Sequence, residues 1–401
     1  MIAHMLVIGL IKESKIPADN RVALVPSQCR WLHRNTDIKV VVQSCETRCY
    51  KDAEYLQAGV EVVDDVSHCD ILFGIKEVPK ELLIPNKMYL FFSHTKKMQP
   101  HNKELFKTMI EKKITLIDYE CLEHEDGQRM IGFGFFAGIV GAHNGMMCYG
   151  KRTRLYNLER VHLIKDYRNL IHTYFGLKLP IVKIAVTGSG RVAHGILEIM
   201  NLMDIQEVEP DEFKEQTFSY PVYVHLKGAN LYTNKETGRY KRNDFHQNPQ
   251  DYTCLFKEYI PYTDILLNGV YWDKNIPRLF EMGDLKNDNF HIKTIADITD
   301  DYNGSVPCNI GDTTIQNPVY GVDKNSFKIT EPYLSNSIDV MAVGNLPNEL
   351  PRDASRYFGE QLIKFVLDDL RKGGSETLEK ATILNKGNIT THYNYMIPYA
   401  E

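Results

Sequence analysis

The chain has 401 residues, of which 43% are hydrophobic and 25% charged, a composition typical of a globular protein of about two to three domains. Its formal net charge of −5 gives no signal for binding polyanions, which argues against nucleic acid as a partner. The apolar run Met5–Ile11 is too short for a secretory signal, and the stretch Phe133–Gly150 falls short of a membrane span. We therefore expect a cytoplasmic protein with neither a membrane nor a nucleic-acid partner.

The first third of the chain alternates short apolar runs with helical stretches. Helices are expected after Pro26 and over Pro100–Lys112. Strands are expected at Leu6–Leu10, Lys39–Gln43, Ile71–Gly74, Met88–Phe92 and Thr115–Asp118. This alternation predicts a parallel sheet flanked by helices.

A second α/β region begins near Leu179. The apolar strand Ile181–Val186 precedes a glycine turn, a helical pattern follows from Val192, and another apolar run starts at Ile205. This succession has the size of a βαβ unit. Residues 213–259 are polar, aromatic and irregular, and we interpret them as an insertion. Later elements are expected as strands at Asp264–Leu267 and Lys293–Ala296, and as an amphipathic helix at Arg352–Leu370.

The glycine turn of this second region fits the dinucleotide-binding fingerprint. The first glycine permits the tight turn, the second lets the backbone approach a pyrophosphate, and the last small residue allows close packing of helix and strand. The anion then lies at the N-terminus of the helix, where free N–H groups attract it. The candidate cofactor residues of this turn are Gly188, Ser189, Gly190, Arg191 and Val192, with Ala193 as the small residue.

A carboxylate that follows the next strand can select the cofactor. Glu209 lies 19 residues after Gly190, where it could accept hydrogen bonds from the adenosine ribose and repel a 2′-phosphate. This favours NAD, with NADP as the alternative. Glu207 and Asp211 are rival candidates, and a solvated acidic loop is the alternative without a ligand.

Motifs in both regions resemble one enzyme superfamily. Lys12-Glu13 and Asn20–Pro26 look like the opening of the alanine dehydrogenase and transhydrogenase superfamily. Further segments narrow the resemblance to the family of lysine–ketoglutarate reductases and lysine-forming saccharopine dehydrogenases. They are Phe91–Lys97, Leu116–Glu120, Gly134–Gly138, Leu267–Trp272, Pro277–Leu279, Asn345–Pro351 and Asn385–Thr390.

The resemblance implies an α/β fold with two Rossmann-like domains, parallel sheets flanked by helices, and a cleft between them. A discontinuous catalytic domain would comprise residues 1–134 and 335–401, and a cofactor domain residues 135–334. The implied reaction is reversible: saccharopine, water and the oxidised cofactor give lysine, 2-oxoglutarate and the reduced cofactor. The enzyme would be an NAD(P)-dependent oxidoreductase acting on a CH–NH bond, working as a monomer or small homo-oligomer.

The resemblance also implies four residues for proton transfer. Lys76 and His94 match the family's acid–base pair, in which the lysine serves the amine and the histidine serves imine hydration and collapse. A histidine titrates near neutral pH, and a lysine does so when burial or nearby cations lower its pKa. Glu77 and Glu120 match the family's flanking carboxylates. The alternatives are an exposed ion pair for Lys76 and Glu77, and a structural histidine for His94.

Further residues are assigned to substrate and cofactor by the same resemblance. Saccharopine carries three carboxylates, so Arg21 and Lys97 are candidates for binding them, Arg through a bidentate grip and Lys as a point charge. For Arg21 the alternative is a surface salt bridge. Phe135 is a further candidate substrate contact. The remaining candidate cofactor contacts are Tyr271, Asp301 and Asn345, with Asp297 and Asp300 as rivals to Asp301.

In one position the chain departs from the family. Relatives usually carry an acidic residue just before the Asn-Leu-Pro segment, whereas this chain has Gly344. Two other functions stay open: an alanine dehydrogenase-like enzyme with a smaller amino-acid substrate and, because of Gly344, a nucleotide-binding sensor without turnover. No cluster of His or Cys has the spacing of metal ligands, so no metal is expected.

Overall fold

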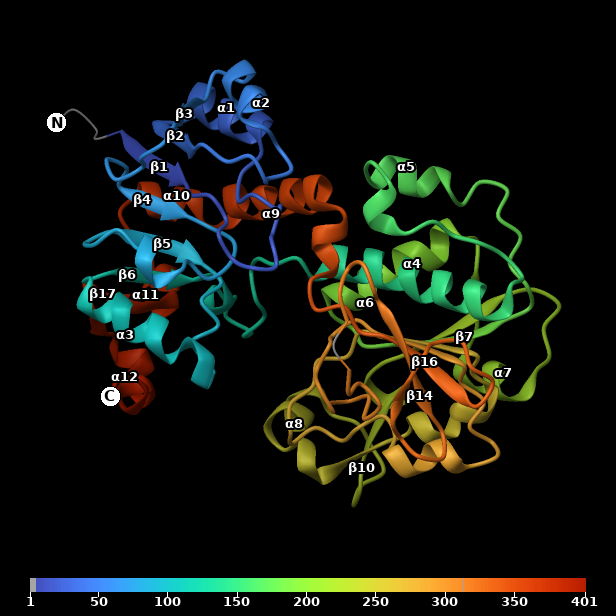
Figure 1. Ribbon diagram of the computed structural model, residues 1–401. Coiled ribbons are helices and arrows are strands. Elements are labelled where there is room, and N and C mark those ends of the chain that lie inside the picture. The colour runs from blue at the N-terminus through green and yellow to red at the C-terminus, as the bar shows by residue number, and fades with distance from the viewer. Residues whose placement is uncertain (1–4, 312) are drawn as a thin grey trace. The chain divides into compact units, whose positions relative to one another are not determined.

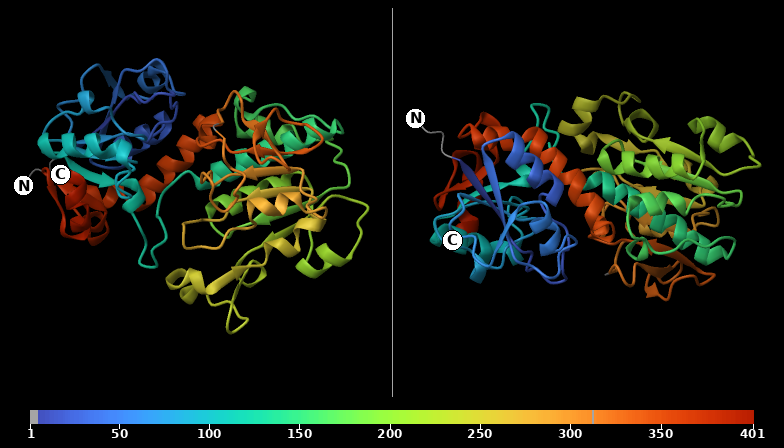
Figure 2. Two further views of the ribbon diagram at one scale, coloured as in Figure 1. Left: turned by 60° about the horizontal axis from the view of Figure 1, so that its bottom comes forward. Right: turned by 90° about the horizontal axis from the view of Figure 1, so that it is seen from above.

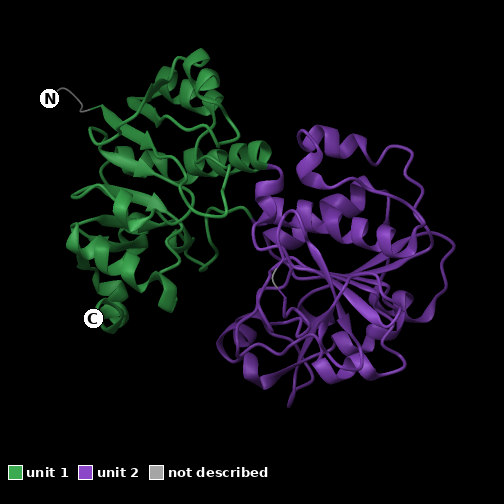
Figure 3. Ribbon diagram, viewed as in Figure 1, with its two compact units in different colours: residues 1–133, 351–401 green, residues 134–350 purple. Residues whose placement is uncertain are grey.

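The computed structural model describes residues 5–311 and 313–401, which form two compact units (Figure 3). Unit 1 comprises Met1–Phe133 and Pro351–Glu401, and unit 2 comprises Gly134–Leu350. Within the described ranges, no helix combines the length and apolarity needed to cross a membrane. By the bounds of these units, the chain passes from unit 1 into unit 2 and returns to unit 1 at Pro351.

Unit 1 is built on a sheet with the order β18-β17-β6-β5-β4-β1-β2-β3. Its strands are β1 (Leu6–Leu10), β2 (Ile38–Gln43), β3 (Glu61–Val63), β4 (Ile71–Phe73), β5 (Met88–Phe91), β6 (Thr115–Asp118), β17 (Thr382–Asn385) and β18 (Asn388–Ile389). Strands β1 to β6 run parallel in the doubly wound order, and β17 adds antiparallel to β6. Such strands are covered on both faces, which explains why Val40, Val41 and Val42 are all fully buried.

Helices flank this sheet (Figure 1). They are α1 (Pro26–Asn35), α2 (Asp52–Gln57), α3 (Lys103–Glu111), α9 (Pro351–Phe365), α10 (Leu367–Arg371), α11 (Glu376–Ala381) and α12 (Ile397–Ala400). An aromatic cluster joins the two parts of the chain: the ring of Phe358 in α9 stacks on Phe133 at 4.5 Å and meets the edge of Tyr119 at 5.2 Å. Both views of Figure 2 show the C-terminal segment against the N-terminal sheet.

Unit 2 contains a second eight-stranded sheet with the order β15-β14-β16-β13-β12-β7-β9-β8. Its strands are β7 (Lys183–Thr187), β8 (Gln206–Glu207), β9 (Val222–Leu226), β12 (Ile265–Asn268), β13 (Thr294–Asp297), β14 (Val319–Asp323), β15 (Ile329–Thr330) and β16 (Ser337–Met341). The run from β8 to β16 is parallel, and β14 and β15 add antiparallel strands at one edge. A separate antiparallel pair joins β10 (Tyr232–Asn234) to β11 (Tyr252–Cys254). The predicted α/β fold class with two Rossmann-like sheets is thus confirmed.

The helices of unit 2 are α4 (Gly134–Thr153), α5 (Tyr167–His172), α6 (Arg191–Leu202), α7 (Pro210–Glu215) and α8 (Arg242–Gln247). Helices α4 and α6 cross at a point where each of them carries a glycine, Gly138 in α4 and Gly195 in α6. A Cβ on Gly138 would lie 2.1 Å from the carbonyl oxygen of Val192, and a Cβ on Gly195 would lie 2.0 Å from that of Phe135. The two glycines therefore allow backbone to pack on backbone directly behind the predicted glycine turn.

Two expectations about unit 2 need correction. Residues 213–259 are not all insertion, because β9 is buried along its whole length and pairs with β7 on one side and β8 on the other. The return to the first domain was expected at 335, but β16 pairs with both β13 and β14, which places residues 335–350 in unit 2. Only the shorter part around β10, α8 and β11 lies outside the main sheet.

Candidate active site

In open α/β sheets, ligands bind outside the carboxyl ends of the strands, where the strand order reverses. In unit 1 this reversal lies between β1 and β4. The segment containing Glu13 follows β1, Lys76 and Glu77 follow β4, and His94 follows β5, the next parallel strand. The sheet thus brings candidates from distant parts of the sequence to one edge.

The carboxylate of Glu77 lies between an imidazole ring and an ammonium group. Its Oε1 is 2.6 Å from Nδ1 of His94, and its Oε2 is 2.6 Å from Nζ of Lys15. Burial acts to raise the pKa of Glu77, but the hydrogen bonds and charges of His94 and Lys15 outweigh it and hold this pKa at about 2. The carboxylate is therefore ionised at neutral pH and fixes one nitrogen of the imidazole ring.

His94 adopts an uncommon backbone conformation. Its φ is 51°, in the left-handed region that non-glycine residues seldom occupy. The side-chain amide of Asn102 donates to the carbonyl oxygen of His94 at 3.3 Å and helps to hold this turn. Such backbone conformations persist where surrounding contacts enforce them, and here the conformation orients the imidazole ring of His94.

Lys76 lies beside a second charged group. Burial and the nearby guanidinium of Arg21 lower the pKa of the Lys76 ammonium, opposed by the carboxylates of Asp19 and Glu77. Glu13 holds the backbone there: its carboxylate accepts the N–H of Ile75 at 2.6 Å and that of Lys76 at 2.9 Å. A lysine that is held in place and has a lowered pKa is suited to general acid–base chemistry.

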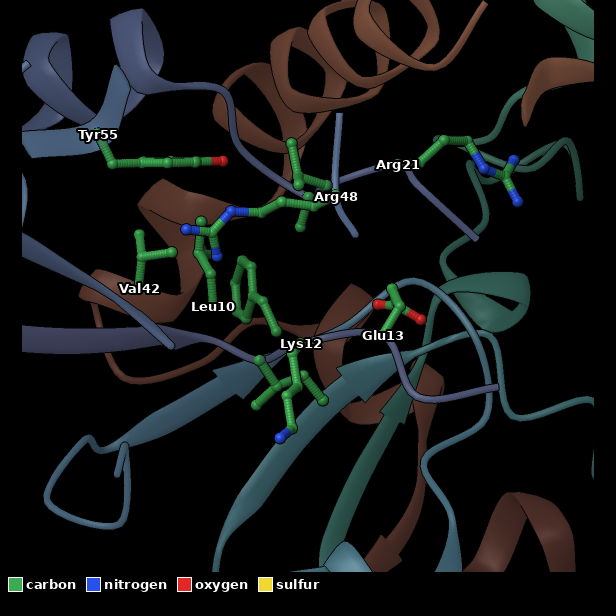
Figure 4. Close-up of a pocket in the computed structure, with 11 residues that line it drawn as sticks. Leu10, Lys12, Glu13, Arg21, Val42, Arg48 and Tyr55 are labelled. Atoms are coloured by element: carbon green, nitrogen blue, oxygen red, sulfur yellow. The ribbon is translucent and has the colours of Figure 1, made fainter. Parts of the chain in front are cut away.

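Arg21 forms a buried pair rather than a surface salt bridge. Its Nε donates to Oδ1 of Asp19 at 2.9 Å, and a second nitrogen binds the other carboxylate oxygen. Burial would raise the pKa of Asp19, but Arg21 holds it at about 2. The guanidinium also lies 4.1 Å from the centre of the Phe133 ring. Figure 4 shows Arg21 and Glu13 lining the same small pocket, with Arg48 nearby.

Two other predicted residues of unit 1, Glu120 and Lys97, differ in their exposure and contacts. Glu120 follows β6 and its carboxylate pairs with Arg129 at 2.9 Å. Lys97 is exposed in the loop after β5. Glu120 thus shares the strand-end edge, whereas Lys97 is a solvent-facing cation.

Glu13 gives this edge a pH-dependent stability. Desolvation raises its pKa from an ordinary 4.5 to about 7, against the lowering effect of the two N–H groups. Between these values the folded protein holds a proton that the unfolded chain has released, so stability falls as pH rises. Glu13→Gln removes this dependence. We expect the variant to gain roughly 2–3 kcal/mol relative to the wild type between pH 5 and 7.5.

Urea unfolding at several pH values measures this difference. Glu81→Gln, at an exposed glutamate of the same unit, is the matched control and should follow the wild type at each pH. Parallel curves for Glu13→Gln and the wild type would contradict the assigned pKa.

The glycine turn of unit 2 follows β7 and leads into α6, as predicted. Gly188 has a φ of 104°, and a Cβ there would lie 2.5 Å from the carbonyl oxygen of Gly269. Its carbonyl oxygen accepts a hydrogen bond from Nε2 of the buried His225 at 2.8 Å. A Cβ on Gly190 would meet no atom within 4 Å. The turn is thus closed on its inner side and open at the helix N-terminus, which fits a bound pyrophosphate.

The other cofactor candidates follow neighbouring parallel strands. Tyr271 comes after β12, Asp301 after β13 and Asn345 after β16. Tyr271 is exposed, and the other two are half-buried. Arg191 and Val192 begin α6 itself, Ser189 is exposed within the turn, and Phe135 lies in the first turn of α4. One edge of the sheet therefore carries most of the predicted set.

A buried network supports that edge. Asp297, at the end of β13, accepts hydrogen bonds from the side-chain amides of Asn268 and Asn309, at 2.8 and 2.9 Å. Burial raises the pKa of Asp297 to about 6, against the lowering effect of these amides. Asn268 also accepts from the hydroxyl of Thr187 at 2.6 Å, which ties the ends of β7, β12 and β13 together.

Glu209 was selected as the carboxylate that follows the next strand after the glycine turn, but that strand is not the neighbour of β7. The strand beside β7 is β9, and β8 pairs beyond it, so Glu209 follows a strand that does not touch β7. Glu209 is exposed at the start of α7, and its rival Glu207 accepts from the hydroxyl of Tyr223 at 3.0 Å. The fingerprint rule places the ribose carboxylate on the neighbouring strand. This strand order removes the structural reason for choosing Glu209.

Some residues of these edges escaped the sequence analysis. Lys15 and Asp19 lie between the two motif fragments near the N-terminus, and only folding reveals their contacts with Glu77 and Arg21. His225 lay within the presumed insertion. Within the described ranges, no group of three or more His, Cys, Asp or Glu side chains is placed to hold a metal ion.

Comparison with known proteins gives a consistent result. Residues 9–140 match the family Alanine dehydrogenase/PNT, N-terminal domain. The chain is 28% identical to alpha-aminoadipic semialdehyde synthase of Arabidopsis thaliana, over 97% of this chain and 41% of that protein. The mitochondrial protein of that name in Rattus norvegicus is also 28% identical, over 98% of this chain and 48% of the relative. The chain thus spans less than half the length of these two relatives.

A shorter relative is matched over most of its length. Saccharopine dehydrogenase (NAD(+), L-lysine-forming) of Candida glabrata is 27% identical, over 86% of this chain and 87% of that protein. Among solved structures, an L-alanine dehydrogenase is similar with a TM-score of 0.66 and 16% identity, over 99% of this chain and 100% of the other. A transhydrogenase from Sinorhizobium meliloti has a TM-score of 0.59 and 16% identity, over 96% and 98%. The structural likenesses show the fold.

These relatives confirm the resemblance seen in the sequence. The chain is thus similar over most of its length to the alpha-aminoadipic semialdehyde synthases and saccharopine dehydrogenases, and residues 9–140 are similar to the N-terminal domain of the alanine dehydrogenase/PNT family.

Proposed function

We propose that this protein catalyses the reversible oxidation of saccharopine. The carbon beside the secondary amine would give up its hydride, which a bound cofactor would accept, and the N–H would give its proton to the protein, which leaves an imine. Water adds to the imine carbon, and the carbinolamine collapses by breaking its C–N bond. Saccharopine, water and the oxidised cofactor thus yield lysine, 2-oxoglutarate, the reduced cofactor and one proton. The observation that carries this proposal is the cluster of Lys76, Glu77 and His94 at the strand-order reversal of unit 1.

Lys76 is proposed as the base that takes the proton of the secondary amine. Burial and Arg21 lower its pKa, which raises the fraction of neutral amine available to accept a proton. His94 is proposed to move the protons of hydration and collapse. Its Nδ1 is held by Glu77, which leaves Nε2 to exchange a proton with water or substrate.

The cofactor, when bound, supplies hydride acceptance and return. The backbone of the Gly188–Gly190 turn and the N-terminus of α6 are proposed to hold its pyrophosphate. The saccharopine dehydrogenase of Candida glabrata is named for NAD(+), and we propose NAD for this chain with NADP as the alternative. Arg21 and Lys97 are proposed to bind substrate carboxylates, and Phe135 is proposed as a further substrate contact. Glu77 and Glu120 are proposed as the carboxylates that flank the acid–base pair. The proposed further cofactor contacts are Tyr271, Asp301 and Asn345.

A direct assay tests the proposal. The purified protein is given saccharopine with NAD or NADP, and lysine plus 2-oxoglutarate with NADH or NADPH, while absorbance at the reduced-cofactor band is followed. We expect turnover in both directions with at least one cofactor. Alanine, and pyruvate together with ammonium, serve as the comparison substrates. Exclusive turnover of these would assign an alanine dehydrogenase-like activity, and cofactor binding without any turnover would assign a sensor.

A further inference from the structure

A histidine from the neighbouring strand holds the first glycine of the proposed cofactor turn. His225 lies in β9, which pairs with β7, and the turn begins directly after β7. Nε2 of His225 is 2.8 Å from the carbonyl oxygen of Gly188, and the N–H of Gly188 donates to the carbonyl oxygen of Leu226 at 3.1 Å. The end of β9 therefore binds both backbone polar groups of Gly188.

The ring of His225 acts in this contact as a neutral donor. Burial is the largest of the effects on its pKa and lowers it below the ordinary 6.5, against the raising effect of the bond to Gly188. A carbonyl oxygen can only accept a hydrogen bond, so the ring proton lies on Nε2. A neutral ring has no charge with which to attract a phosphate, and its contribution to the turn is therefore geometric.

The peptide bond that follows Gly188 links this buried contact to the open side of the turn. In a trans peptide, the C=O and the next N–H point in opposite directions. Because His225 binds the carbonyl of Gly188, the N–H of Ser189 points away from the imidazole ring. Ser189 and Gly190 are exposed, and among the residues that the structure describes neither N–H has a hydrogen-bond partner. The contact with His225 thus sets the direction of an N–H that can receive an anion.

The contact matters because the residue that it holds is a glycine. Glycine moves between backbone conformations more readily than any other residue. If the carbonyl of Gly188 had no donor, the peptide that follows it could turn over and direct an oxygen, in place of an N–H, towards a bound anion.

We propose that His225 is a positioning residue for the cofactor, which keeps the N–H of Ser189 directed at the pyrophosphate by holding the carbonyl of Gly188. This inference rests on the proposed binding of a nicotinamide dinucleotide at the turn. It assigns to β9 the task of shaping the turn, whereas the pyrophosphate itself is bound by the backbone.

Binding of NADH to two variants of His225 tests this role, with fluorescence and calorimetry as the measurements. His225→Leu removes the donor, so the turn is in its binding orientation for only part of the time. The apparent Kd rises by the inverse of that fraction, and we expect affinity to fall about tenfold. His225→Gln places an amide donor near the position of Nε2 and should bind NADH within about threefold of the wild type.

A second buried histidine of unit 2 supplies the matched control. His143 in α4 is fully buried, and its Nε2 likewise lies 2.8 Å from a backbone carbonyl oxygen, that of Glu159. His143→Leu should lower the melting temperature yet leave NADH affinity unchanged, at a temperature where all the proteins are folded. An equal loss of affinity in the two leucine variants would assign the loss to reduced stability and overturn the inference. Wild-type affinity in His225→Leu, or no recovery in His225→Gln, would overturn it as well.

The same measurements distinguish this inference from the proposed reaction. A wild-type protein that binds NADH but does not turn over saccharopine overturns the reaction alone, since no amino-acid substrate enters the binding assay. A wild-type protein that does not bind NADH overturns both the proposed cofactor and the role of His225.

Discussion

Lys76→Met is expected to lower kcat for saccharopine oxidation by about two to four orders of magnitude, the usual contribution of a positioned acid–base group. Methionine keeps much of the length and volume of lysine but cannot take up a proton. Because the ammonium of Lys76 is paired through space with Asp19 and Glu77, its removal also changes the charge of the cluster. The expected loss lies in kcat, since the substrate carboxylates would bind elsewhere.

Steady-state kinetics with saturating saccharopine and cofactor measure this effect. Lys80→Met changes an exposed lysine of the same segment and should leave kcat unchanged. NADH affinity should be the same in all three proteins, because the proposed cofactor turn belongs to unit 2. A Lys76→Met enzyme that keeps more than about a tenth of wild-type kcat would remove Lys76 from the acid–base role.

Gly190→Ala is expected to weaken NADH binding about 100-fold or more, equivalent to roughly 3 kcal/mol or more. Gly190 adopts extended backbone angles that alanine tolerates, and its Cβ would project into open space. The added methyl group would therefore leave the fold intact and occupy the space where the backbone must approach a pyrophosphate. Thermal unfolding should show a melting temperature close to that of the wild type.

Two other glycine variants serve as comparisons for this prediction. Gly188→Ala should lose both stability and binding, because its φ of 104° and its approach to Gly269 exclude a side chain. Gly283→Ala also projects into open space but lies outside the turn, so it should bind NADH normally. Unchanged NADH affinity in Gly190→Ala would show that the turn does not hold the cofactor.

The sequence predicted elements whose signals are local. The strands β1 and β6 were placed with their observed bounds. For β1 the reason is that a strand inside a parallel sheet reads as an uninterrupted apolar run. The glycine turn was found for a similar reason, since strand, turn and helix follow one another directly. The motifs around Lys76 and His94 fall at strand ends, where a sheet brings distant segments together.

The parts that were missed depend on contacts that are distant in sequence. Strand β9 has an apolar sequence but lies among polar and aromatic residues, and only its pairing with β7 identifies it. Helix α4 contains glycines that disfavour helices intrinsically. These glycines become necessary only in the fold, where a Cβ on Gly138 or Gly145 would collide with α6 or with Leu267 and Ala296. The bond between Lys15 and Glu77 spans 62 positions of the sequence and leaves no local trace.

The split construction of unit 1 has a consequence for how the protein is made. A ribosome synthesises all of Gly134–Leu350 before it produces α9 or β17. Unit 2 can therefore complete its folding while the N-terminal sheet still lacks its antiparallel partner, and β6 presents open hydrogen-bonding groups during that interval. During this interval the N-terminal segment is thus the part of the nascent chain most exposed to aggregation and to binding by chaperones.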